Sequence, residues 1–555
     1  MNFFYITILY KVSMSEIYKV LEPRVNVVAD TEKTHMVLLG GQRVQQATFV
    51  ADSHSDNGCN FSITPPSSTT IIDRYVRVRS YIEVTLQGGD LDLTSHDAFR
   101  QFPFSSVLDV INVEINGETI SQAIGSHLHA FLCYGNDAND RRKSWTTSPS
   151  MPDTYQEYND FLTHGSAMNP LADRGENSID IPRGAFSVQT IGSNKVRIEV
   201  VEPIWISPFY SGLGHQVEGM VNVNSLNISM RFKQDLGRCF SHSVHDGDLV
   251  TGISATFFQA PELLMTFITP SLTQRLPEVQ VLPYLQPVHY QRSVPQMASG
   301  ATLTVMSDTV RLSQIPKFLY LHFPHSEATK DFTVSDAFCA IERVSINWGN
   351  ETNLLGNASK QDLYEMSVRN GLNVSYPDFE NFKGSVIAVE FGKDIGLLDF
   401  EAPGVQGSYN IQVQVDIKNT SASPFTPVFN MSVINEGTFT VGPNVARASL
   451  GNLTPEMVLA ARDNAPQVHH IGYYEIRGGG FWSGLKTLVH KVAHGVGKVA
   501  GPVATAMGHP EVGASVAGIA KGIENLTGGR ISGGSRPVLA TGRIQMSSGG
   551  RRIRG

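Results

Sequence analysis

The sequence has little cysteine and no cysteine motif. Its 555 residues include four cysteines, widely separated along the chain at Cys59, Cys133, Cys239 and Cys339. Structural zinc sites use closely spaced cysteine pairs such as CxxC, and the sequence contains none, so a structural zinc site is not expected. The same spacing argues against a disulfide framework and favours assembly in a reducing compartment.

A long apolar segment is also missing. The N-terminal stretch MNFFYITILYKVSMSEIY has a short apolar run that ends at Lys11, with no basic segment before it and no small-residue cleavage site after it. We therefore do not expect a signal peptide, and Met14 is an alternative start of translation. No run approaches the roughly 20 apolar residues that a membrane-spanning helix needs.

Short motifs of catalysis and cofactor binding are missing as well. The sequence has no GxSxG, no GxxxxGKS/T, no HExxH, and no GxGxxG before a helix. The stretches HSDNG (54–58) and SHSVHDGD (241–248) are interpreted as solvated loops, and His469-His470 as part of a linker. We therefore predict no catalytic residue, no cofactor-binding residue and no metal ligand, and we do not expect an enzyme.

What the chain does have is a strand pattern from about residue 60 to 445. In RYVRVRSYIEVTL (74–86), apolar and polar residues alternate, a period of two that predicts a half-buried strand. The apolar face consists of Val76, Val78, Ile82, Val84 and Leu86. On the opposite face, Arg77 and Arg79 are predicted either to form ion pairs between subunits or to lie on a solvated surface.

Further strands predict an all-β fold. Asn116-Gly117 in VEINGETI suits a type I′ hairpin turn, because both central residues of that turn have positive φ. Other strands are predicted at 195–201, 226–232, 261–268, 301–312, 317–323, 384–391, 409–417 and 428–441. Many strands with few helices are typical of sandwiches or barrels. Trp145, Trp205 and Trp348 are predicted to be core or interface anchors.

One short pattern occurs twice. VEINGETI (113–120) precedes the helical stretch SQAIGSHLHAFL, and VSINWGNETNLL (344–355) precedes the helical stretch SKQDLYEMSVRNG. Both read Val-x-Ile-Asn, a turn, Glu-Thr and an apolar residue, followed by a helix. The repetition favours a duplicated β-sandwich domain. The segment TPSLTQRLPEVQVLPYLQP (269–287) is the natural linker between the two copies.

Two sandwiches of this size resemble a known family. The second contains SINWGNETNLLGNASKQDLYEMSVRNG (345–371) and GSVIAVEFGKDIGLLDFEAPGVQGSYNIQVQVDI (384–417). It is similar to double jelly-roll major capsid proteins of eukaryotic DNA viruses, in particular the adintovirus, polinton and virophage-like group. The resemblance covers roughly residues 45 to 450. It implies an all-β fold of two consecutive jelly-roll β-sandwich domains, followed by a glycine-rich basic helical C-terminal tail.

The resemblance also implies a structural function without a cofactor. Three chains would form a homotrimer, a pseudo-hexagonal capsomer of six barrels, and capsomers would tile the icosahedral capsid of a virion assembled inside the host cell. Neighbouring capsomers, penton proteins and minor capsid proteins are the implied partners. The predicted segments are an N-terminal arm (1–44), a first jelly roll (45–268), a Pro-rich linker (269–287), a second jelly roll (288–470) and a basic amphipathic tail (471–555).

The tail differs from the rest of the chain in charge and periodicity. From Arg477 onward the net charge is +9, which leaves −17 for the remainder of a chain whose total is −8. Apolar residues from Leu485 to Val503 recur at helical spacing, and most of the cations fall off that stripe, a pattern typical of helices that lie in a membrane surface. The predicted membrane- or shell-binding residues are Phe481, Trp482, Leu485, Lys486, Leu488, Val489, Lys491, Val492 and Lys498.

The sequence leaves three alternatives open for the tail. The first is that the tail packs on the base of its own capsomer, and the second is that it contacts an inner membrane or inner shell. The third is that its last arginines contact viral DNA. The apolar-x-Gly-Gly-x pattern at 476–480 and 526–530 resembles the cleavage motif of adenovirus-type maturation proteases. Cleavage between Gly479 and Gly480, and between Gly529 and Arg530, would release a peptide that resembles the membrane-lytic segment of adenovirus protein VI.

Two other functions are compatible with a β-rich chain. A carbohydrate-active or carbohydrate-binding β-sandwich should show clustered carboxylates and aromatic residues, and commonly a secretion signal, and the sequence offers neither clearly. A minor capsid or spike protein is the third reading, but its single jelly roll would need a shorter chain.

Overall fold

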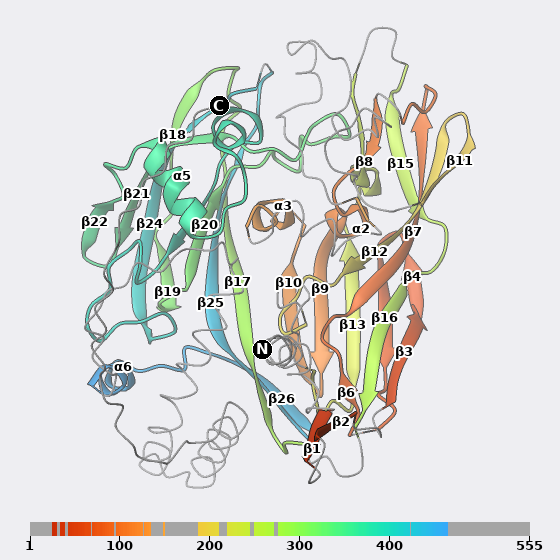
Figure 1. The fold of residues 1–555 in the computed structure, drawn as a ribbon. Helices are drawn as coiled ribbons and strands as arrows, with labels where there is room; N and C mark the ends of the chain where they lie inside the picture. The colour runs from red at the N-terminus through yellow and green to blue at the C-terminus, as the bar shows by residue number, and fades with distance from the viewer. Residues whose placement is uncertain are drawn as a thin grey trace, which may run out of the picture. The chain divides into compact units, whose positions relative to one another are not determined.

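The computed structural model describes most of the first 463 residues. The described ranges are 25–29, 34–38, 43–67, 69–93, 96–125, 127–134, 148–149, 187–209, 219–244, 249–270, 276–421 and 423–463. All of them belong to one compact unit, residues 1–492, while a second unit, residues 493–555, lies outside the described residues. Within the first unit, two pairs of packed sheets follow one another along the chain (Figure 1).

The first jelly roll consists of two antiparallel sheets around one core. One sheet has the order β10 (Glu118–Ala123), β9 (Leu108–Ile115), β13 (Leu226–Phe232), β5 (Gly58–Ile63) and β4 (Ser53–Ser55). The other has the order β11 (Ser187–Gly192), β12 (Lys195–Pro203), β7 (Arg77–Gln87), β16 (Glu262–Thr269) and β3 (Arg43–Val50), with β15 (Gly252–Phe257) beside β7 and β6 (Ile71–Ile72) beside β16.

Smaller elements connect the long strands of the first jelly roll. They are the pair β8 (Asp97–Phe99) and β14 (Phe240–His242), the short helices α2 (Pro103–Ser106) and α3 (Leu128–Phe131), and the 3-10 turn η3 (Leu236–Cys239). A separate hairpin of β1 (Val25–Ala29) and β2 (Thr34–Leu38) falls inside the segment that the sequence assigned to an N-terminal arm.

The second jelly roll repeats the two-sheet plan. One sheet has the order β17 (Gln280–Ser293), β25 (Val428–Gly442), β20 (Phe318–His322) and β23 (Val386–Glu390), with β26 (Val445–Leu450) on β25. The other has the order β18 (Thr302–Met306), β24 (Gln406–Lys418), β21 (Ala340–Trp348) and β22 (Glu351–Leu354), with β19 (Val310–Gln314) also on β24. Helices α5 (Lys360–Arg369) and α6 (Pro455–Asp463) and the π-helical turn η4 (Asp378–Phe382) complete it.

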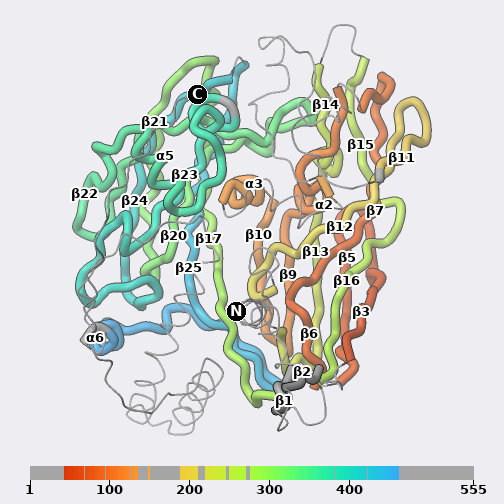
Figure 2. The backbone as a smooth tube through the Cα atoms, viewed as in Figure 1, coloured from red at the N-terminus to blue at the C-terminus, as the bar shows by residue number. Residues whose placement is uncertain are grey.

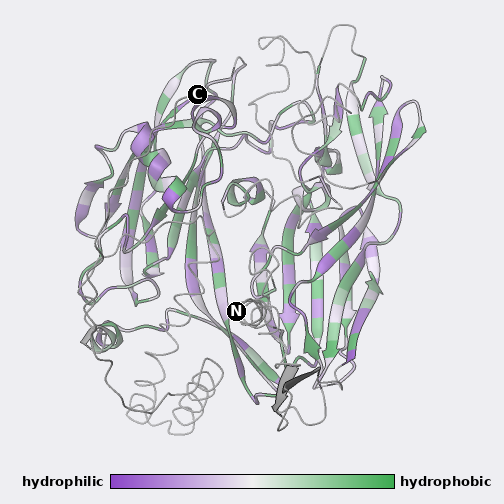
Figure 3. Cartoon of the chain, viewed as in Figure 1, coloured by the Kyte–Doolittle hydropathy of each residue, from purple (hydrophilic) through white to green (hydrophobic). Residues whose placement is uncertain are grey.

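Strand β7 illustrates why the sequence folds this way. Its burial alternates residue by residue, as the period of two predicts, so that its apolar face enters the core. Figure 3 colours the hydropathy of each residue along the strands. On the outer face, Arg79 donates to Glu262 at 2.9 Å and lies 3.3 Å from Glu199. The Arg77 guanidinium lies over the ring of Tyr75. Arg79 is therefore already paired with acidic residues on neighbouring strands of its own sheet.

The repeated sequence pattern marks equivalent positions in the two domains. β9 and β10 form a hairpin through Asn116 and Gly117, whose φ values of 48° and 87° confirm the predicted turn. β21 and β22 form the corresponding hairpin of the second domain. Each hairpin occupies the edge of its sheet, in the order β10-β9-β13 and β22-β21-β24, and precedes a helix, α3 or α5.

The tryptophan predictions have a mixed outcome. Trp205 and Trp348 are buried in the cores of the first and second domain, and Trp348 stacks on Tyr409 with ring centroids 5.3 Å apart. Trp145 lies outside the described residues.

The Pro-rich segment 269–287 is a linker over a shorter length than expected. Its second half, from Gln280, is the beginning of β17, which pairs with β25 along its whole length. Pro283 and Pro287 are compatible with this strand because β17 is at the edge of its sheet. An edge strand leaves one side unpaired, so a missing backbone N–H breaks no ladder.

Candidate functional site

The two jelly rolls exchange parts at their junction. The segment 127–134, which contains α3, follows the β9–β10 hairpin of the first jelly roll, but Ala130, Cys133 and Tyr134 are buried in the core of the second. The Tyr134 hydroxyl donates to the Val386 carbonyl at 2.7 Å, and the Asn373 N–H donates to the Cys133 carbonyl at 2.8 Å. In Figure 2, α3 accordingly lies between the two sets of strands.

An exchange in the opposite direction takes place where β17 begins and β25 ends. Leu282, Tyr284, Phe439 and Val441 belong to these strands of the second jelly roll, yet they are buried in the core of the first. Hydrogen bonds between side chains of the first jelly roll and the backbone of the second reinforce the packing. The Asn116 side chain donates to the Gly442 carbonyl at 3.2 Å, and Glu118 accepts from the Ala448 N–H at 3.0 Å.

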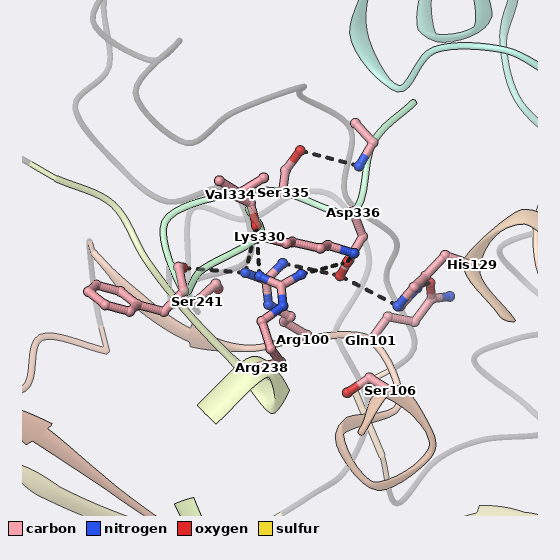
Figure 4. Close-up of polar contacts among 12 residues, drawn as sticks. Arg100, Gln101, Ser106, His129, Arg238, Ser241, Lys330, Val334, Ser335 and Asp336 are labelled. Atoms are coloured by element: carbon pink, nitrogen blue, oxygen red, sulfur yellow. Dashed lines mark hydrogen bonds and ion pairs between the residues drawn. The ribbon is translucent and has the colours of Figure 1, made fainter. Parts of the chain in front are cut away.

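A buried ionic cluster centred on Asp336 joins the two jelly rolls beside α3 (Figure 4). Arg100, after β8, and Arg238, in η3, come from the first jelly roll, and each approaches one Asp336 oxygen at 3.1 Å. Lys330 and Asp336 come from the loop between β20 and β21 of the second, and their charged atoms are 2.6 Å apart. The His129 ring, from α3, lies 3.5 Å from the same carboxylate. We call Arg100, Arg238, Lys330 and Asp336 the junction cluster.

Backbone carbonyls satisfy the remaining guanidinium hydrogens of the junction cluster. Arg100, of which 1% of the side chain is exposed, donates to the Phe240 carbonyl at 3.0 Å and to the Val334 carbonyl at 2.7 Å. Arg238 donates to the Asp331 and Val334 carbonyls. Because Asp331 and Val334 belong to the loop of the second jelly roll, the two arginines hold that loop through both its side chains and its backbone.

The charges in the junction cluster determine its protonation. Burial alone would raise the pKa of Asp336, but the cations Lys330, Arg100 and Arg238 outweigh burial and hold this pKa well below its ordinary value. The carboxylate is therefore ionised at neutral pH. Burial lowers the pKa of His129 to about 3, more than the neighbouring Asp336 raises it, so the ring is neutral.

A second carboxylate borders the cluster. Burial would raise the pKa of Glu327, but Lys330, Lys233 and Arg238 lower it to about 2. Lys233 belongs to the first jelly roll and approaches Glu327, on the β20–β21 loop, at 3.4 Å. The Glu327–Lys233 pair is therefore a partly exposed ion pair between the two jelly rolls, beside the buried pairs of Asp336.

Within the described ranges, no group of three or more His, Cys, Asp or Glu side chains could hold a metal ion. No helix of the described part of the chain is long and apolar enough to cross a membrane. All four cysteine thiols are buried, and burial raises the pKa of the Cys59 and Cys239 thiols to about 12.

The stretch SHSVHDGD differs from its sequence interpretation. Ser241, His242 and Ser243 are buried rather than solvated, and His242 contacts Asp97 at 2.8 Å in the β8–β14 pair. Residues 245–248 lie outside the described ranges, while His54 of HSDNG is exposed on β4, as predicted for a solvated position.

The residues predicted from the tail lie outside the described residues. These are the cleavage residues Gly479, Gly480, Gly529 and Arg530, together with Phe481, Trp482, Leu485, Lys486, Leu488, Val489, Lys491, Val492 and Lys498. His469 and His470 lie outside them too. Conversely, sequence reasoning missed Arg100, Arg238 and Asp336, because these residues are far apart in the chain and form no short motif.

Comparisons with known proteins agree with this architecture. The family model of the Sputnik virophage major capsid protein first domain matches residues 16–196. The model of the major capsid protein V20 C-terminal domain matches residues 288–383 and 380–437. The putative capsid protein V20 of Sputnik virophage is 30% identical to this chain over 582 residues, covering 94% of this chain and 96% of the relative.

Solved structures show the same likeness. A chain in the cryo-EM structure of the Sputnik virophage is 30% identical, with a TM-score of 0.72, and the match covers 81% of this chain and 97% of that chain. The crystal structure of the mavirus major capsid protein has a TM-score of 0.60 at 15% identity, over 77% of this chain and 93% of that chain. At that identity, the mavirus match indicates a shared fold.

We predict that Asp336→Asn destabilises the junction strongly. The substitution removes the buried negative charge that Arg100, Arg238 and Lys330 share, and leaves Glu327, 3.8 Å from Lys330, as the remaining carboxylate beside them. Removing one partner of a buried ion pair typically costs about 3–5 kcal/mol. Chemical unfolding of the purified chain measures the effect.

The matched control for this prediction is Asp308→Asn. Asp308 pairs with Arg292 at 3.8 Å, but 89% of its side chain is exposed, so its replacement should change stability little. Equal stability of the two variants would contradict the role assigned to Asp336.

Proposed function

Because the chain belongs to the family of virophage major capsid proteins and is therefore a component of the virion capsid, we propose that three copies form its capsomer. Each chain contributes two jelly rolls, so that a trimer has six barrels and a pseudo-hexagonal outline. Capsomers of this outline tile an icosahedral shell. The resemblance to capsid proteins and the fold of two jelly rolls, both expected from the sequence, are confirmed.

The observation that supports this proposal is the reciprocal exchange at the junction. A pseudo-hexagonal capsomer requires the two barrels of one chain to keep a fixed relation, because contacts that close after three copies tolerate little variation in angle. The segment 127–134 in the second core, the ends of β17 and β25 in the first core, and the junction cluster supply three separate attachments. A single flexible linker would supply none.

Exposed apolar side chains are candidates for contacts with other subunits. Leu398 and Phe400, in the loop between β23 and β24, are 57% and 41% exposed, and Leu249 and Val445 are 69% and 65% exposed. Grouped apolar side chains such as Leu398 and Phe400 favour contact with another protein surface. Neighbouring capsomers, penton proteins and minor capsid proteins are the proposed partners of such surfaces.

The tail supports a further part of the proposal, which rests on sequence. Residues 471–555 face the particle interior, where the basic amphipathic stretch binds an inner membrane, with the inner shell and viral DNA as the alternative contacts. The aromatic pair Phe481-Trp482 at its start and the cations beside its apolar stripe suit a negatively charged lipid surface. A maturation protease cuts at 479/480 and 529/530. No specific observation favours the carbohydrate-binding alternative.

We predict that the recombinant chain is a trimer. Light scattering coupled to size-exclusion chromatography should give three times the chain mass of 60.6 kDa, and negative-stain microscopy should show pseudo-hexagonal particles. A stable monomer at high protein concentration would contradict the proposal.

Membrane binding by the tail is tested with vesicles of phosphatidylcholine and phosphatidylserine. The full chain should float with these vesicles, and the Phe481→Ala/Trp482→Ala double variant should lose most of this binding, because interfacial aromatic anchors are removed while the charge is kept. The control is Leu459→Ala, which removes another exposed apolar side chain, on α6. Equal flotation of the double variant and the parent chain argues against this contact.

Cleavage of the tail is tested on particles. We expect the intact mass of the chain from purified virions to correspond to an end at Gly479, with a separate peptide of residues 480–529. A chain that retains its full mass in mature particles would show that the two Gly-Gly sites are not cut.

A further inference from the structure

Three histidines meet at the junction, each from a different element. His127 precedes α3 in the first jelly roll, whereas His289 is on β17 and His322 on β20 of the second. The His127 and His289 rings are stacked, with centroids 3.5 Å apart and planes 6° from parallel. His322 presents its edge to His127 at a centroid distance of 5.7 Å. His127 and His322 are buried, with 3% and 0% exposure.

The hydrogen bonds of these rings suit neutral imidazoles. The Gln291 amide nitrogen lies 3.3 Å from His127 Nε2, and the Asn430 amide nitrogen lies 3.3 Å from His322 Nε2. In these orientations the amide donates and the ring nitrogen accepts, which requires that nitrogen to carry no proton. His289 Nδ1 contacts the Ser432 hydroxyl at 2.8 Å. A protonated His127 or His322 has no acceptor nitrogen left for its amide partner.

The charged surroundings also oppose protonation. The cation Lys233 lowers the pKa of His127, and His289 and His322 lower it further where they carry a proton. His129, on the same segment, is surrounded by Asp336, Lys330, Lys383 and Lys233. The nearby carboxylates, Asp336 and Glu327, are already engaged by cations of the junction. A proton added to the histidines is therefore added to a positively charged region.

Burial makes the neutral form dominant while the junction is closed. It lowers the pKa of His289 to about 4, and together with His289 it lowers the pKa of His322 to about 3. For His127, burial is again the largest cause, and the pKa falls far below its ordinary value. When the junction opens and the rings become solvated, their pKa values return toward 6.5.

A partly open pocket lies beside α3, the helix that follows His127. It has a volume of about 120 Å³ and is lined mostly by apolar side chains, among them Leu128, Phe131 and Tyr320. Phe131 lines this pocket and also contacts the stack, since its ring centroid lies 6.4 Å from His127 and 6.0 Å from His289. The segment that carries His127 therefore borders unfilled space beside α3.

We propose that the three histidines make the junction between the jelly rolls an acid-sensitive latch. While His127, His289 and His322 are neutral, the segment 127–134 stays seated in the second jelly roll. Protonation breaks the amide contacts, places like charges on stacked rings and releases the segment. The trigger is thus a fall in pH, and the part that moves is the attachment between the two domains of one chain.

The direction of the effect follows from linkage. A histidine with a lowered pKa in the closed junction binds its proton mainly in the open form, so the closed form is fully favoured above pH 6.5 and loses stability below it. Each such histidine makes opening about tenfold more favourable for each unit of pH below 6.5, until its pKa in the closed form is reached. His129 titrates in the same window and adds to this slope.

The experiment is hydrogen–deuterium exchange of the assembled full-length chain between pH 7.5 and 5.0, corrected for intrinsic exchange. The Asn373 amide, which donates to the Cys133 carbonyl, reports whether the segment is seated, and amides of β21, within the second jelly roll, serve as the internal reference. We expect the opening constant at Asn373 to rise steeply below pH 6.5 while β21 remains protected. An opening constant that does not change with pH would overturn the proposal.

Variants assign the effect to the histidines. His127→Phe keeps an aromatic ring in the stack but cannot be protonated, so the rise should be about tenfold smaller for each pH unit than in the parent chain. His289→Gln is the second variant, with an uncharged side chain near Ser432, and His54→Gln, on the exposed strand β4, is the control. An unchanged slope in both junction variants, or a slope that falls equally in His54→Gln, would overturn the proposal.

Discussion

Three cations can be buried between two β-sandwiches here because one carboxylate lies among them. Asp336 engages Arg100, Arg238 and Lys330, and backbone carbonyls take up most of the remaining guanidinium hydrogens. A charge transferred from water into a protein interior is stable only when it is paired and hydrogen-bonded. The loop that carries Asp336 therefore has one favourable position, and that position fixes the second jelly roll against the first.

The exchanged apolar side chains supply most of the favourable free energy of the junction. The ion pairs of the junction cluster fix the geometry, but the cost of removing their charges from water cancels much of their attraction. Buried apolar area contributes favourable free energy without requiring a particular geometry. Tyr134 fills the second core from the first domain, and Tyr284 and Phe439 fill the first core from the second. Ionic specificity and apolar exchange together make the two sandwiches behave as one block, as a capsid subunit requires.

The repeating parts of the fold were predictable from the sequence, and the junction was not. Alternation in β7 and the Asn116-Gly117 turn are local signals, because period and positive φ are properties of neighbouring residues. The strand from Gln280 was missed since prolines normally mark loops, and only its place at a sheet edge makes them acceptable. Arg100 and Asp336 are more than two hundred residues apart, and nothing near either residue indicates the other.

Reciprocal exchange has a consequence for how the chain is synthesised. The core of the first jelly roll includes Phe439 and Val441, and Glu118 is bonded to the Ala448 amide, so this domain is incomplete until the ribosome has passed residue 450. Contacts between such distant residues also slow folding, because the connecting chain must be closed into a loop first. A chain that ends before β25 lacks part of both cores, so the first jelly roll cannot be completed until the last long strand of the second has been synthesised.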